Sequence, residues 1–467
     1  MENRSDLIIW LVIWIGICIS ILSSQWSQKV PSVGLPFAYL LNLSMIHFVG
    51  GLIYALPWYE AKSAYLIQSG ANYTQVSTGF IQSVYGVIGF GIGSIILAYW
   101  LVTLIKPRWL KLIPQKPDLK LPTKLLKIGL LFFFFISPNI VKIQGLQGFS
   151  TSGIYLCVVA LCLACWRSWY LGNKKQLLFW IGVSCILPII TINLLGFIGY
   201  GASASLIILI FVSSFYRPKW HTVLIGLLVF IFGLSVYVTY MRDRGEIRAI
   251  VWGNQSIESR YEKMVNTFSN FEIIDFYNQR HLEAIDTRLN QNGLVGKAVE
   301  YINDGQATFA FGETLWEAFI SPIPRLLWPD KPIFAGSGNL VSSFTGQKFA
   351  DNTSVGVGQV LEFYINFGSV GVFVGFLVMG IVIRIIDMAA GSYLINGDWL
   401  GYTSWFLPGM VLLQPGGSLT EITASSAASV VLVVIMKKFI IKPQKNITVL
   451  NNLDSSHKQI NSKQENF

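Results

Sequence analysis

Cationic side chains gather in one hydrophilic stretch of the sequence, residues 241–355. Arginine suits phosphate because its planar guanidinium stays charged and can donate two parallel hydrogen bonds to phosphate oxygens. The type and grouping of these residues predict a phosphate-binding surface. For Arg242 and Arg244, ordinary anchoring at a membrane interface, with Asp243 and Glu246 as partners, is an open alternative. The candidates in chain order are Arg242, Arg244, Arg248, Arg288, Arg325 and Lys331.

Four prolines, at positions 322, 324, 329 and 332, surround Arg325, Trp328 and Lys331. Proline fixes the backbone angle φ and removes a hydrogen-bond donor, so this segment is stiff without being a helix or a strand. Rigidity of this kind is what a preorganised site for charge needs. The alternative is a structural turn that Trp328 anchors at the membrane interface.

Carboxylates that could take up a proton are few. Glu362 lies inside an apolar run, where a carboxylate is costly unless it is paired. We expect Glu362 to pair with an arginine of the hydrophilic stretch or to act as a general base. Glu313 and Glu317 share one helix face and are weaker candidates for the base.

Metal ligands are not grouped in the sequence. His47 and His281 are isolated, and Cys162-x-x-Cys165 lies in an apolar run without a nearby histidine. All five cysteines fall in apolar runs, so no disulfide framework is indicated.

The elements that must position these residues are membrane spans, because 53% of the chain is hydrophobic and only 12% is charged. A helix needs roughly 20 apolar residues to cross the hydrocarbon core. We therefore predict an all-α, multi-pass membrane protein with about 11 (10–12) transmembrane helices. The predicted spans are 7–23, 34–57, 80–105, 124–141, 150–170, 176–193, 195–215, 220–240, 356–386, 399–414 and 418–440.

Four regions follow from this pattern. Residues 1–240 carry the first spans, 241–355 form one large loop of short helices, 356–440 carry the last spans, and 441–467 form a disordered polar tail. Helical spacing predicts an amphipathic helix from Ile257 to Phe271 and a second helix near 293–303. A Gly/Ser-rich segment at 193–205 permits close helix packing or forms an unwound outer segment that lines a cavity. Residues 414–418 predict a tight turn on the same outer side as the large loop.

The distribution of charge predicts the orientation. Short loops rich in lysine and arginine, at 106–127, 167–175 and 217–219, mark the cytoplasmic side, which puts residues 241–355 outside. That stretch holds 11 Lys+Arg against 14 Asp+Glu, although the whole chain is formally +10. The basic excess therefore reflects topology and anionic lipid, and no nucleic-acid partner is expected.

Three segments carry a resemblance to a known family: 311–314 (FGET), 323–332 (IPRLLWPDKP) and 362–368 (EFYINFG). In order and separation they resemble the Wzy-type O-antigen or oligosaccharide repeat-unit polymerases of bacteria. The length, the number of spans and the single large outer loop are similar too. The resemblance covers chiefly residues 280–370, and the string IPRxxWPxKP is its most specific part.

The resemblance implies a membrane glycosyltransferase with a GT-C-like fold at the outer face of the bacterial plasma membrane. Its donor and acceptor would be oligosaccharide repeat units linked to undecaprenyl pyrophosphate, with no cofactor and no metal. A flippase and a chain-length regulator would be its partners. On this basis we expect Arg325, Lys331 and Arg288 to bind the pyrophosphate with help from Arg242 and Arg244, and replacement of Arg325 by alanine to abolish polymer. The predicted substrate-binding residues also include Arg248, Trp328 and Glu317. Glu362 is the candidate general base.

Two other functions are open at the level of sequence. A ligase that transfers the finished glycan to another acceptor would use the same fold and similar arginines. A flippase or another transporter of lipid-linked sugars is a different class. That class is disfavoured because charged residues within the spans are scarce.

Overall fold

The computed structural model describes residues 4–27, 30–68, 72–137, 147–216, 220–253, 255–323, 327–332, 336–349 and 355–440. Across these residues the chain is helical and contains no strand. Eight helices are long and apolar enough to cross a membrane, or nine if one bent pair of helices counts as a single span. The prediction of an all-α, multi-pass membrane protein is thereby confirmed.

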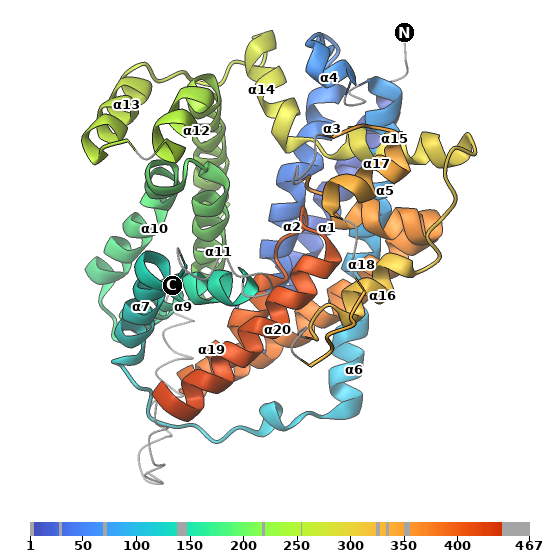
Figure 1. The fold of residues 1–467 in the computed structure, drawn as a ribbon. Helices are drawn as coiled ribbons and strands as arrows, with labels where there is room; N and C mark the ends of the chain where they lie inside the picture. The colour runs from blue at the N-terminus through green and yellow to red at the C-terminus, as the bar shows by residue number, and fades with distance from the viewer. Residues whose placement is uncertain are drawn as a thin grey trace.

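Figure 1 shows the helices in chain order, with a long extended segment between α6 and α7. The first half contains α1 (Ser5–Ser27), α2 (Leu35–Ile46), α3 (Phe48–Ala55), α4 (Ala64–Gln68), α5 (Tyr73–Ile92), α6 (Ala98–Ile105), α7 (Leu121–Leu131), α9 (Gln147–Tyr170), α10 (Lys174–Leu195), α11 (Ile198–Tyr216) and α12 (Trp220–Trp252). The second half contains α13 (Ile257–Ser269), α14 (Gln279–Leu289), α15 (Asn292–Asn303), α16 (Glu313–Ile320), α17 (Ser337–Thr345), α18 (Gln359–Ile395), α19 (Trp399–Val411) and α20 (Leu419–Ile435).

The number of spans is lower than the eleven apolar runs predict, and three runs explain the difference. The run at 34–57 is the bent pair α2 and α3, which meet at His47 with an angle of 43°. In the run at 124–141, α7 ends at Leu131 in a π-helical turn, and residues 138–146 lie outside the described part. The run at 399–414 forms α19, whose 13 residues span only about 20 Å at ~1.5 Å per residue.

Close helix packing forms the centre of the bundle. α5 contacts α18, and a Cβ atom added at Gly89 or Gly93 would lie 2.2 Å from a carbonyl oxygen of α18. Gly79 of α5 faces α15. In return, a Cβ added at Gly296 of α15 would lie 1.8 Å from the carbonyl oxygen of Gln75 on α5. Small residues let membrane helices approach in this way. As a result α15, from the predicted loop, is held directly against a membrane span.

The two ends of the bundle differ in chemistry. The lysine-rich segment between α6 and α7 runs along one end, whereas α13 and α14 lie at the other (Figure 1). This is the separation that the distribution of charge predicts. α14 contacts α12 on one side and α2, α3 and α4 on the other, so it bridges two parts of the bundle.

α12 extends further than the predicted span at 220–240. Its helix continues without a break to Trp252, so the predicted domain boundary at residue 241 falls inside a helix. Arg242, Arg244 and Arg248 therefore lie on the last three turns of a long helix rather than in a loop. Their directions are fixed by the helical repeat.

Candidate functional site

The geometry of α12 separates the arginines that the sequence groups together. Successive residues of an α-helix turn by about 100°, so residues three or four apart share a face. One face of α12 carries residues with this spacing: Tyr237, Tyr240, Arg244 and Arg248. Arg242 lies about 200° from Arg244 around the helix and points to a different side.

Arg242 is neutralised by carboxylates. Its Nε lies 2.9 Å from Oδ1 of Asp243, and its Nη1 lies 2.7 Å from Oε1 of Glu272. It also donates hydrogen bonds to the backbone carbonyls of Asn270 and Thr267. These bonds tie the end of α13 to α12, and Asp243 is one of the two partners expected from the sequence. The expected partner Glu246 instead pairs with Lys263.

Glu272 is the centre of this anchoring network. It accepts hydrogen bonds from Arg242, Arg280 and His281. Burial opposes its ionisation, but the hydrogen bonds from Arg242, His281 and Arg280 outweigh burial and lower the pKa of Glu272 to about 2. The carboxylate is therefore ionised at neutral pH and is fully engaged by its partners.

Arg244, Arg248 and Arg288 form a separate group, which we call the arginine cluster. Arg288 comes from α14, and Arg288 and Arg248 are both close enough to Arg244 to act on it electrostatically. Arg244 lies close to Tyr240, whose hydroxyl donates to the Gly196 carbonyl at 2.8 Å. Within the described residues, no carboxylate forms an ion pair with any member of the cluster.

Aromatic rings hold Arg248 in place. Its Cζ atom lies 4.4 Å from the centroid of the Phe197 ring and 5.0 Å from that of Trp252. Its Nε also points at the Gly196 carbonyl, at 3.4 Å. Gly196 ends α10 in the left-handed conformation with φ of 74°, which brings Phe197 under the guanidinium. Cation–π contact of this kind fixes an arginine without neutralising its charge.

Tyr237 adds an unusual polar group beside the cluster. Its hydroxyl oxygen is buried and has no hydrogen-bond partner in the part of the chain that the structure describes. Arg288, Arg244 and Arg248 are among the charges that act on it. A buried polar atom without a partner is costly. Three cations and a buried hydroxyl together are suited to an anion with several oxygen atoms.

A buried carboxylate positions α14 and with it Arg288. Asp286 accepts hydrogen bonds from the hydroxyls of Tyr54 and Tyr59, at 3.0 and 2.6 Å, and from the side chain of Asn290 at 2.6 Å. Burial raises the pKa of Asp286, and the three hydrogen bonds oppose that rise. Because Tyr54 ends α3 and Tyr59 follows it, this network docks α14 against the N-terminal helices.

Of the proline-rich segment, the structure describes residues 322–323 and 327–332, which include Lys331 and Trp328. Nζ of Lys331 donates to the backbone carbonyls of Ser321 and Ile323, at 2.9 and 3.1 Å, just beyond the end of α16. Lysine commonly satisfies carbonyls at a helix C-terminus in this way. Trp328 is half-buried in the adjoining turn. Arg325, the leading candidate from the sequence, lies outside the described residues.

Glu362 caps a helix. It is 1% exposed, and its Oε2 accepts a hydrogen bond from the backbone N–H of Leu419, the first residue of α20, at 2.7 Å. A carboxylate is stabilised at this positive end of a helix. The expected pairing of Glu362 with an arginine is not found among the described residues. Glu317 on α16 is near enough to act on it electrostatically, and burial, followed by Glu313, raises the pKa of Glu317.

The predicted residues therefore fall into two places. The arginine cluster lies on α12 and α14, whereas Lys331, Trp328, Glu317 and Glu362 lie around α16 and the start of α20, and the two regions are apart in Figure 1. Tyr237, Tyr240 and Phe197 were not predicted. The spacing of Tyr237, Tyr240, Arg244 and Arg248 along one helix face is the signal that could have identified the first two.

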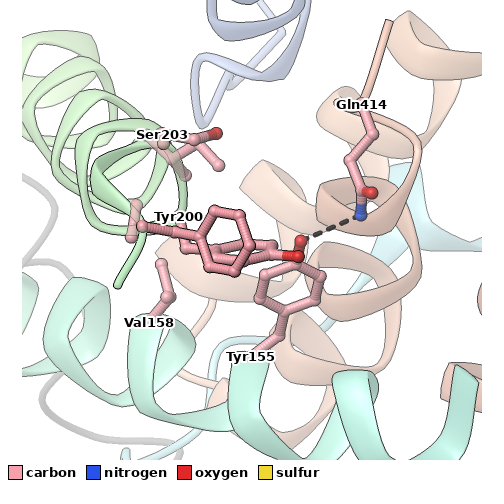
Figure 2. Close-up of a pocket in the computed structure, with 9 residues that line it drawn as sticks. Tyr155, Val158, Tyr200, Ser203 and Gln414 are labelled. Atoms are coloured by element: carbon pink, nitrogen blue, oxygen red, sulfur yellow. Dashed lines mark hydrogen bonds between the residues drawn. The ribbon is translucent and has the colours of Figure 1, made fainter. Parts of the chain in front are cut away.

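A cavity of about 290 Å³ opens beside Phe197 (Figure 2). It lies between α9, α11 and the turn that joins α19 to α20, and Tyr155, Phe197, Tyr200, Ser203 and Gln414 are among the residues that line it. The segment at 193–205 packs closely and borders the cavity, but it is helical from Ile198 onward, so the expected unwound segment is not found there. Gly201 packs closely, since an added Cβ would lie 2.3 Å from the Leu187 carbonyl oxygen, whereas Gly199 lines the cavity.

Comparison with known proteins gives one match. Residues 113–448 match a domain of unknown function, DUF8712. The chain belongs to the DUF8712 family. No curated protein and no solved structure matches it. The DUF8712 match includes the arginine cluster and all the residues that line the cavity, whereas α1 to α6 precede it.

Proposed function

We propose that this DUF8712 protein is a membrane glycosyltransferase with a GT-C-like fold. It would join oligosaccharide repeat units linked to undecaprenyl pyrophosphate into a polymer at the outer face of the bacterial plasma membrane. The observation that carries the proposal is the arginine cluster. Across the described parts of the chain, its three guanidinium groups have no paired carboxylate and the neighbouring buried hydroxyl has no partner, an arrangement that suits a diphosphate.

The surface of α12 favours a lipid-linked anion over a free one. Below the cluster, this helix exposes Leu227, Leu228, Val229 and Phe232, which are 50 to 65% exposed. In a membrane protein such a surface faces lipid. An amphiphile could therefore place its phosphates at the arginine cluster while its prenyl chain follows α12 into the bilayer.

The chemistry follows from the charges. A hydroxyl of the acceptor sugar attacks the anomeric carbon of the donor, the bond from this carbon to the pyrophosphate oxygen breaks, and the lipid pyrophosphate leaves with the electron pair. The proton of the attacking hydroxyl passes to water or to the departing pyrophosphate. Negative charge grows on the leaving group next to Arg244 and Arg288. Preorganised donors at such a position typically lower a barrier by a few kcal/mol each. Because pyrophosphate leaves readily, we assign no general base, and Glu362 keeps its role as a helix cap.

An elongation assay with the purified protein in detergent tests this proposal. We expect the wild type to convert lipid-linked repeat units into longer lipid-linked chains, and Arg244→Ala to form none. Arg242→Ala, on the same helix but outside the cluster, should keep elongation at temperatures where it is folded. Detergent offers no second compartment, so elongation there excludes transport as the only activity. A folded wild type that never elongates such substrates would refute the proposal.

Glycan analysis in cells separates a polymerase from a ligase that would use the same cluster. We expect cells that carry Arg244→Ala to show single repeat units in place of polymer. Long chains that remain on the carrier lipid would identify a ligase instead.

A further inference from the structure

We propose that the cavity between α9, α11 and the α19–α20 turn is a sugar subsite, which holds a pyranose ring of the glycan whose diphosphate binds the arginine cluster. This inference rests on the proposed function and names the part of the ligand that the cavity takes. Ligand pockets typically combine aromatic walls with a few convergent polar groups, and this cavity has both.

The polar groups of the cavity match sugar hydroxyls better than a hydrocarbon chain. Nε2 of Gln414 donates to the Tyr155 hydroxyl at 2.9 Å, so the hydrogen of that hydroxyl and the carbonyl oxygen of the Gln414 amide are available to a ligand. Figure 2 shows these two side chains meeting at one side of the cavity, across from Ser203 and Val158. A prenyl chain would leave such donors and acceptors without partners, which costs binding energy.

The aromatic groups provide the flat walls. Phe197 and Tyr200 pack edge to face with their centroids 5.7 Å apart, and both line the cavity. The face of an aromatic ring is negative and attracts the weakly positive C–H groups of a sugar ring. Ser203 is fixed by a hydrogen bond to Asn42 at 2.9 Å, which holds this part of α11 in place.

The cavity lies next to the arginine cluster. Phe197 lines the cavity and also carries the guanidinium of Arg248 over its ring, at 4.4 Å. A ligand at Arg248 and a ligand in the cavity would therefore contact the same side chain. In a lipid-linked sugar the first ring is bonded directly to the diphosphate. The neighbouring positions of cluster and cavity fit that connection.

Binding measurements on the full-length protein in detergent test the inference with defined probes. The probes are geranyl pyrophosphate and four versions that carry glucose, galactose, N-acetylglucosamine or N-acetylgalactosamine on the terminal phosphate. We expect the wild type to bind at least one sugar-bearing probe about tenfold more tightly than geranyl pyrophosphate itself.

Two variants should remove this tenfold gain and leave the affinity for geranyl pyrophosphate within twofold of the wild type. Gly199→Phe fills the cavity, and its Cβ would meet no atom within 4 Å, so the helix should accept it. Tyr200→Ala removes one wall at a residue that is 60% exposed. The matched control is Gly182→Phe on α10, which also meets no atom within 4 Å and lies outside the cavity. It should keep the gain.

Three results would overturn the sugar subsite while the arginine cluster stands. The first is equal affinity of the wild type for all five probes, and the second is a gain that persists in both Gly199→Phe and Tyr200→Ala. The third uses farnesyl pyrophosphate as an added probe: it binds more tightly than geranyl pyrophosphate, and Gly199→Phe abolishes that difference. The last result would assign the cavity to lipid. Failure of the proposed function looks different. In that case geranyl pyrophosphate does not bind, or Arg244→Ala binds it as well as the wild type does.

Discussion

Two alanine variants on α12 should differ in what they lose. Arg244→Ala should lose ligand affinity and Arg242→Ala should lose stability, although the two residues are close together in the sequence. Arg244 belongs to the arginine cluster and has no paired carboxylate among the described residues, whereas Arg242 is paired with Asp243 and Glu272. We expect Arg244→Ala to lose affinity for a prenyl pyrophosphate and to keep its stability. We expect Arg242→Ala to lose stability and to keep most of its affinity.

The size of each effect follows from the contacts. A hydrogen bond to a charged group contributes about 1.5–3 kcal/mol, and 1.4 kcal/mol is tenfold in affinity, so Arg244→Ala should bind about 10- to 150-fold more weakly. It also removes a like charge one turn from Arg248, which relieves about 0.2–0.5 kcal/mol. Arg242→Ala removes one cation from two carboxylates that are 17 and 24% exposed, which leaves Lys263 beside Asp243 and Arg280 beside Glu272. This should lower the free energy of unfolding by about 1–3 kcal/mol.

Two measurements on the purified variants check this pair. Titration calorimetry with geranyl pyrophosphate gives the affinity, and tryptophan fluorescence during heating gives the midpoint of unfolding. Added salt should weaken binding to the wild type more than binding to Arg244→Ala, because one screened charge is missing in the variant. The reasoning is refuted if Arg244→Ala binds like the wild type, or if both variants lose affinity equally.

Three further substitutions have expected outcomes. The pKa of Glu272 is lowered to about 2, so its contribution to stability is present above the ordinary value near 4.5 and is lost as the pH falls toward 2. In Glu272→Gln the unfolding midpoint should therefore fall less steeply between pH 4.5 and pH 2 than in the wild type. An equally steep fall in the variant would contradict the assignment. Glu362→Gln should keep elongation, because the amide oxygen can still accept from Leu419, whereas complete loss would restore Glu362 as a base. Gly296→Ala should lower the unfolding midpoint strongly, because its Cβ would lie 1.8 Å from a backbone oxygen, whereas Gly233→Ala, which meets no atom within 4 Å, should leave it unchanged.

The class of fold could be predicted from the sequence because repeated apolar runs of about 20 residues are typical of helices that cross a membrane. Among the described residues, fewer helices reach the length of a span than the eleven runs predict, because an apolar run does not show where a helix bends or ends. α2 and α3 break at His47, and α19 stops after 13 residues. The amphipathic helix that begins at Ile257 exists as α13, but Ile257 and Tyr261 are exposed, and its contact with α12 and α10 uses Met264 and Phe268.

The candidate site was predictable in residue type but not in grouping. Arginine after an apolar run is visible in the sequence, and so is the helical spacing from Tyr237 to Arg248. The partners that decide each role are distant in the chain. Glu272, which neutralises Arg242, lies 30 residues away, and Gly196, which accepts from Arg248, lies 52 residues away. The distinction between an anchoring arginine and one available to a ligand therefore required the fold.

The most direct test of the arginine cluster is a cryo-EM map of the protein with a bound prenyl pyrophosphate. We expect density for both phosphates within hydrogen-bonding distance of Arg244 and Arg288, with the prenyl chain along the exposed apolar face of α12. Phosphate density at Lys331 and the proline-rich segment, with none at the arginine cluster, would contradict the assignment.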